Sequence, residues 1–217
     1  LESLYPNEIS SGPAKTSKIE INRTFLVQVF SIIFFTTALG GLIFQSTTFA
    51  LPKILDERLN DFATNATEVG IWAFIVFTVA AFAQLVVGYL VDRHSVKLVF
   101  SVIAGCQVVL FALMMNLDGV AALFVSVGFM LMVFGQIPIN DVLIGRVAKS
   151  EWRSRAFAIR SFVTFSVYAT SIPLIAWLHA TWGFPALFLV LCICAAFIFS
   201  AVLMLPKIEV VLGIANN

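Results

Sequence analysis

The chain has 217 residues, of which 60% are hydrophobic, 12% are charged and 22 are phenylalanine, and its mean hydropathy is +1.01. A soluble domain carries roughly twice this charged fraction, so the composition excludes a soluble enzyme, a disordered chain and a nucleic-acid-binding protein. The net charge of +1 says nothing as a sum, so its distribution along the chain is what matters.

Six apolar stretches follow one another along the chain, each near the ~20 residues that a membrane-spanning helix needs. A transmembrane β-barrel would show alternating segments of about ten residues, whereas residues 73–87 are apolar on all sides. We therefore predict an all-α membrane protein with six transmembrane helices. The predicted spans are residues 25–51, 70–91, 98–116, 120–145, 157–178 and 184–205.

Prolines, glycines and polar residues separate these spans. The predicted breaks are Pro52, residues 92–95, a tight turn at 116–119, a charged loop at 146–155, and Gly183. Because the connections are short, consecutive helices are expected to lie side by side and antiparallel.

The basic residues predict the orientation. Six spans place both chain ends on one side of the membrane, and 11 of the 13 Lys and Arg residues fall on that side. Lys53 and Arg58 are the other two. By the positive-inside rule the basic side faces the cytoplasm, so both termini are predicted to be cytoplasmic.

One motif lies between the second and third spans, where residues 88–97 read GYLVDRHSVK. It resembles the cytoplasmic-loop signature of the major facilitator superfamily, G-x-L-a-D-r-x-G-r-k. Ser95 stands where a glycine is usual. The matching positions are Gly88, Leu90, Asp92, Arg93 and Lys97.

This resemblance implies a fold and a function. Transporters of the family have two six-helix halves, each made of two inverted three-helix repeats. One signature copy is present, which implies one half, and its departure at Ser95 together with the polar lead-in resembles the carboxy-terminal half. We therefore expect a transmembrane domain at 25–206, a cytoplasmic linker at 1–24 and a cytoplasmic tail at 207–217. A missing N-terminal half is the expected partner, and the two halves together would transport a small solute by alternating access. Protons or another ion would drive this transport, and no cofactor is expected. The expected location is the plasma membrane (the inner membrane of a bacterium).

The resemblance also implies a gate on the cytoplasmic side. Asp92 would lie under the N-terminal end of the fifth span, near residues 154–155, where free N–H groups and the helix dipole stabilise a carboxylate. Arg93, Lys97 and Arg146 would extend this charge network and hold the cytoplasmic side closed. The alternative is that these are solvated loop charges that only set the topology.

Polar side chains inside the spans predict a solute cavity. Gln45 lies in the outer part of the first span, and Gln136 and Asn140 lie four residues apart on one face of the fourth. The resemblance makes these two spans cavity-lining helices. Amides facing lipid are costly, so we expect all three to point inward and contact the solute; hydrogen bonding between helices is the alternative.

Asp141 is the one acid predicted inside a span. Intramembrane acids mark proton relays, so proton coupling is one interpretation. Asp141 also lies near the inner end of its span, where an ion pair with Arg146 explains it equally well.

Two other function classes remain as alternatives: an intramembrane enzyme, and a structural subunit or channel. A rhomboid-like protease needs an intramembrane histidine beside its serine nucleophile, but His94 falls in a loop and His179 at an outer helix end. No H-E-x-x-H metal motif or phosphate-binding loop occurs in the sequence, so no catalytic or metal site is predicted. Rows of charge or a carbonyl filter typical of channels are also absent.

Overall fold

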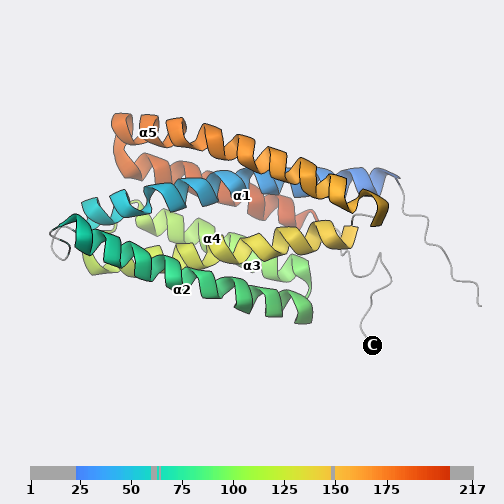
Figure 1. Cartoon of the computed structure of the whole chain (residues 1–217), viewed down its shortest axis with the longest axis horizontal. Helices are drawn as coiled ribbons and strands as arrows, with labels where there is room; N and C mark the ends of the chain where they lie inside the picture. Colours follow the sequence, from blue (N-terminus) through green and yellow to red (C-terminus); the bar gives the residue numbers. More distant parts are fainter. Residues whose placement is uncertain (1–22, 60–62, 64, 148–149, 206–217) are drawn as a thin grey trace, which may run out of the picture.

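The computed structural model describes residues 23–59, 63, 65–147 and 150–205, and this part of the chain contains helices and no strands (Figure 1). Each helix is long and apolar enough to cross a membrane. The predicted tail at 207–217 and all but the last two residues of the predicted linker at 1–24 lie outside the described residues. The helices are α1 (Arg23–Arg58), α2 (Ala66–Arg93), α3 (Val96–Met114), α4 (Gly119–Val147) and α5 (Ser150–Leu203).

Polar side chains begin two of the helices. Oδ1 of Asn65 accepts a hydrogen bond from the backbone N–H of Glu68 at 3.0 Å and so caps α2. Oγ of Ser95 accepts from the N–H of Leu98 at 3.2 Å and caps α3. Such caps satisfy N–H groups that have no partner within the helix. The break predicted at 92–95 is confirmed at residues 94–95, because α2 runs to Arg93.

Two predicted boundaries are wrong. Pro52 does not end the first helix, because α1 continues to Arg58 and buries Ile54 and Leu55 completely beyond the proline. Leaving the helix at Pro52 would lose this burial, and membrane helices tolerate a proline inside them. The charged loop predicted at 146–155 is much shorter, because α4 runs to Val147 and α5 begins at Ser150.

The fifth helix doubles back on itself at Gly183. This residue has φ 74° and ψ −174°, a conformation outside the helical region that glycine adopts readily. Figure 1 shows the two arms, residues 150–182 and 184–203, running side by side in opposite directions. The described part thus has five helices where six spans were predicted, and the last two predicted spans are the arms of α5.

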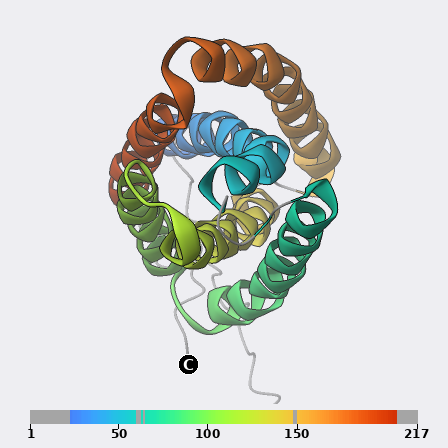
Figure 2. The same ribbon diagram turned by 90° about the vertical axis from the view of Figure 1, so that its left-hand side faces the viewer.

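The helices form a bundle with α1 and α4 towards its middle. In the end-on view of Figure 2, α5 arches over α1, while α2 and α3 flank α4. A cluster of three buried rings joins α3, α4 and the second arm of α5: the centroids of Phe111, Phe129 and Phe188 lie 5.5 to 6.3 Å apart. Such ring pairs stabilise a core beyond the area that they bury.

The outer faces of the helices are apolar. Large side chains stand exposed on them, with as much as 74% of the Phe162 surface accessible. In water such a surface would aggregate, whereas in a bilayer it meets hydrocarbon. The chain is therefore an integral membrane protein. Other examples on four helices are Phe49, Phe74, Phe82, Leu85, Phe124 and Phe165.

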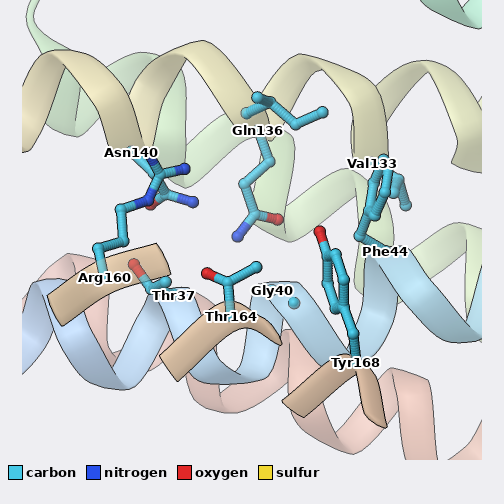
Figure 3. Close-up of a pocket in the computed structure, with 11 residues that line it drawn as sticks. Thr37, Gly40, Phe44, Val133, Gln136, Asn140, Arg160, Thr164 and Tyr168 are labelled. Atoms are coloured by element: carbon cyan, nitrogen blue, oxygen red, sulfur yellow. The ribbon is translucent and has the colours of Figure 1, made fainter. Parts of the chain in front are cut away.

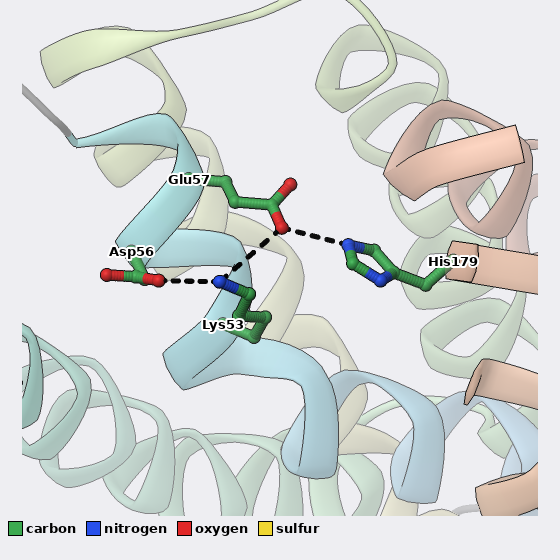
Figure 4. Close-up of polar contacts among 4 residues, drawn as sticks. All are labelled: Lys53, Asp56, Glu57 and His179. Atoms are coloured by element: carbon green, nitrogen blue, oxygen red, sulfur yellow. Dashed lines mark hydrogen bonds and ion pairs between the residues drawn. The ribbon is translucent and has the colours of Figure 1, made fainter.

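Ionic contacts join the helices at the end where α1 finishes (Figure 4). Lys53 Nζ lies 2.7 Å from Asp56 Oδ2 and 3.7 Å from Glu57 Oε1, both on α1. The same Glu57 oxygen lies 2.9 Å from Nε2 of His179, which stands on α5 just before its turn. Exposed pairs like these stabilise little individually, but the last one links α1 to α5.

Candidate functional site

A polar pocket of about 40 Å³ lies between α1, α4 and the first arm of α5 (Figure 3). Its lining residues recur at helical spacing on all three helices, which therefore present one face each to the pocket. Most of the bundle interior is apolar, so this concentration of polar groups stands apart. The polar lining residues are Thr37, Gln136, Asn140, Arg160, Thr164 and Tyr168.

Glycines on α1 let α4 approach closely at this point. A Cβ on Gly40 would lie only 2.6 Å from Nε2 of Gln136, so any side chain there would displace the amide. The neighbouring Gly41 faces Tyr168, where an added Cβ would make ordinary contact at 3.5 Å. Gly40 is thus required for the position of Gln136, and Gly41 is not.

The buried amides form a chain that ends in the pocket. Nε2 of Gln107 on α3 donates to Oε1 of Gln136 at 3.0 Å, between two buried side chains. Beyond this bond, Gln136 Nε2, Asn140 Oδ1 and Thr37 Oγ1 have no partner among the described residues, although each side chain is at most 6% exposed. A buried polar atom left unpaired costs about 1–3 kcal/mol, so a polar partner at this position would stabilise these groups.

One charged side chain lines the pocket among the described residues. Nη1 of Arg160 on α5 donates to Oδ1 of Asp141 on α4, while the Nε of this guanidinium has no described partner. Asp141 is thus paired with Arg160 and not with Arg146 as the alternative had it; Arg146 Nη2 donates to the carbonyl of Val91 at 3.3 Å. Arg160 reaches Asp141 because α5 contacts α4 in this part of the bundle.

The hydroxyls of α5 differ in whether they bond to their own helix. Five donate to carbonyls of their own helix, as Ser and Thr often do; these are Ser166, Thr170, Ser171, Thr181 and Ser200. Thr164 makes no such bond among the described residues and lines the pocket. Tyr168 also lines it, with its ring stacked 6.0 Å from that of Phe44. The hydroxyls of Thr164 and Tyr168 therefore contribute to the polar lining of the pocket.

The predicted cavity residues are only partly brought together. Gln136 and Asn140 share the pocket as their spacing predicts, whereas Gln45 lies half-buried on α1 outside its lining. The prediction missed Arg160 because it was grouped with the cytoplasmic cations. Arg160, Thr164 and Tyr168 are spaced four residues apart and so share one helix face. This spacing was the signal that could have placed Arg160 on the pocket face.

The predicted gate residues lie at the end of the bundle where α2 finishes. Asp92 is exposed, and α2 packs on α1, α3 and α4 but not on α5 in the part that the structure describes. The expectation that Asp92 lies under the start of the fifth span is therefore wrong. Arg93 covers the ring of Tyr89 at 4.8 Å.

Two cations at this end hold the C-termini of helices. Lys97 Nζ donates to the carbonyl of Leu203, the last residue of α5, at 2.7 Å. Arg146 does the same for α2 through Val91. A cation at a helix C-terminus satisfies a free carbonyl and opposes the helix dipole. Of the remaining motif residues, Leu90 packs on the core and Gly88 has no atom within 4 Å of an added Cβ.

Comparison with known families gives one match. A family model described as Major Facilitator Superfamily matches residues 25–212, a range that contains the motif at 88–97 and every residue lining the pocket. No curated protein matches the chain.

Proposed function

The chain belongs to the Major Facilitator Superfamily, whose members transport small solutes across membranes, and on this premise we propose that it forms one six-helix half of a secondary transporter. The two arms of α5 supply the fifth and sixth crossings. The inverted repeats would divide at the turn before Gly119, where φ is +64°. An N-terminal half would supply the opposite wall of the solute cavity. Both termini of this chain would lie in the cytoplasm, and the protein would lie in the plasma membrane, the inner membrane of a bacterium.

The observation that carries this proposal is the polar pocket between α1, α4 and α5. Polar and ionisable groups inside a membrane domain are expensive and mark solute or ion pathways. In this family substrate sites lie where the repeats meet, and α1 and α4 would be the first helices of the two repeats. Gln136 and Asn140 on α4 are the proposed solute contacts, and Gln45 is a further candidate when the cavity is open.

Alternating access requires contacts that hold one side closed and then break. We place the gate at the motif, where Gly88 and Leu90 lie in the last turns of α2 and Asp92 and Arg93 are exposed at the end of that helix. Lys97 and Arg146 support this role, because their bonds to helix ends at α5 and α2 would have to break if the helices separated.

Asp141 is the proposed coupling carboxylate. When it takes up a proton it loses its charge, and the ion pair that ties α4 to Arg160 on α5 is lost. Proton entry would thereby free the first arm of α5 to move. Asp141→Asn should then transport at a rate that no longer depends on the proton gradient, and full dependence in this variant would exclude the role.

Uptake by the complete protein in proteoliposomes tests the function. Radiolabelled sugars, amino acids and carboxylates are supplied with and without a pH gradient, and at least one should enter faster than into protein-free vesicles. Asn140→Leu should slow that uptake, whereas Gln84→Leu on α2, outside the pocket, should not. Absence of uptake for every solute, or equal rates in the two variants, would contradict the proposal.

A further inference from the structure

Arg160 lines the pocket, and one edge of its guanidinium has no partner among the described residues. Guanidinium has five N–H donors in a planar fork, and those on Nε and Nη2 point the same way. Asp141 accepts from Nη1, whereas no described residue accepts from Nε or Nη2. A parallel pair of N–H donors matches the two oxygens of a carboxylate, so this edge is shaped for one.

The neutral groups around Arg160 complement an oxyanion. Figure 3 shows the amide of Gln136 turned towards Thr164 and the hydroxyl of Tyr168, while Asn140 stands beside the guanidinium. Gln136 Nε2 is an unpaired donor, and Asn140 Oδ1 is an unpaired acceptor. The donors suit a negatively charged oxygen, and the acceptor suits a hydroxyl or amine next to it.

The size of the pocket limits what it can hold. A cavity needs a volume of at least about 10–15 Å³ to hold one water, and the volume of this pocket is about 40 Å³. The three heavy atoms of a carboxylate fit, whereas a sugar ring does not. The pocket therefore takes one end of a solute, and the rest lies outside it.

We infer that this pocket binds the carboxylate end of the transported solute on the Nε–Nη2 edge of Arg160, with Gln136 as a second donor. This inference rests on the proposed function and names its class of substrate. Asp141 remains on Nη1, and its negative charge opposes the incoming carboxylate at short range. Removing that charge should therefore tighten binding.

Matched ligand pairs test the inference on the purified complete protein in detergent. Acetate, lactate and benzoate are compared with acetamide, lactamide and benzamide, which keep the shape and lose the charge, and inorganic phosphate tests for a general oxyanion site. A ligand that binds the folded state raises the melting temperature. At least one carboxylate should do so, and its amide and phosphate should not.

Variants then assign the binding to Arg160. Arg160→Gln should weaken carboxylate affinity about 10- to 100-fold, as loss of a charged hydrogen bond does. Arg160→Lys should fall in between, because it keeps the charge and loses the fork. Asp141→Asn should bind more tightly than wild type, and Arg153→Gln, an exposed cation on the same helix, should leave affinity unchanged.

Several results would overturn the inference: no carboxylate shifts the melting temperature, an amide or phosphate acts as strongly, or Arg160→Gln and Arg160→Lys bind like wild type. If Arg160→Gln does not fold, the ligand pairs on the wild-type protein and the affinity of Arg160→Lys still test whether the pocket binds a carboxylate. Uptake of an uncharged solute without carboxylate binding would leave the transport function standing and reject the carboxylate site alone.

Discussion

Replacing Gly40 with alanine is the sharpest test of how the pocket is built. The new Cβ would lie 2.6 Å from Gln136 Nε2, whereas ordinary contact begins near 3.4 Å, so the amide must move by the difference. That amide is also held by Gln107 through a 3.0 Å hydrogen bond. We therefore expect Gly40→Ala to displace Gln136 from its bond and from the solute.

The structure sets the size of the effect. Losing the bond to Gln107 costs about 0.5–1.5 kcal/mol of folding free energy, and alanine in a helix interior recovers about 0.5–1 kcal/mol relative to glycine. Stability should thus change little. Solute binding loses one hydrogen bond, which corresponds to a decrease in affinity of about 2- to 12-fold.

Gly41→Ala is the matched control, because its Cβ would meet Tyr168 at an ordinary 3.5 Å. It should bind solute like wild type and melt slightly higher. Uptake kinetics and melting temperature are measured for both variants and for each combined with Gln136→Ala. Once the amide is absent, Gly40→Ala should cost nothing further. Equal effects of the two glycine variants, or additive effects in the double variant, would refute the reasoning.

Two further predictions concern packing and orientation. Gly135→Ala should destabilise the bundle by about 1–3 kcal/mol, because its Cβ would lie 2.8 Å from Cγ2 of Val87 on α2; thermal unfolding checks this, with Gly145→Ala, which has open space, as the control. In a variant without the three native cysteines, an impermeant maleimide added to intact cells should label Asn116→Cys, whereas Arg153→Cys should react only after lysis. The reverse pattern would overturn the cytoplasmic placement of the termini.

Glycines at turns and the spacing of residues along one helix predicted the features of the fold that depend on few residues. A turn at 116–119 and a break at Gly183 follow from glycine alone, and the structure gives both glycines positive φ. The four-residue spacing of Gln136 and Asn140 predicted a shared face, which the pocket confirms. Each of these inferences needs only the geometry of one helix or one turn.

What depends on packing between helices was not predictable in the same way. Pro52 is a helix breaker by composition, yet the burial of Ile54 beyond it keeps α1 helical. Arg160 has the sequence context of a cytoplasmic cation, and only the placement of α5 beside α4 turns its side chain into the pocket. Gln45 is one residue beyond Phe44, which lines the pocket, and that single step rotates it off the lining face.

The bonds from Lys97 and Arg146 to helix ends restrict how this sequence can evolve. The same two cations belong to the charge asymmetry that predicts which way the protein inserts, and they also close the ends of α5 and α2. A mutation that reverses either charge would therefore remove a contact at a helix end and weaken the predicted charge asymmetry at the same time.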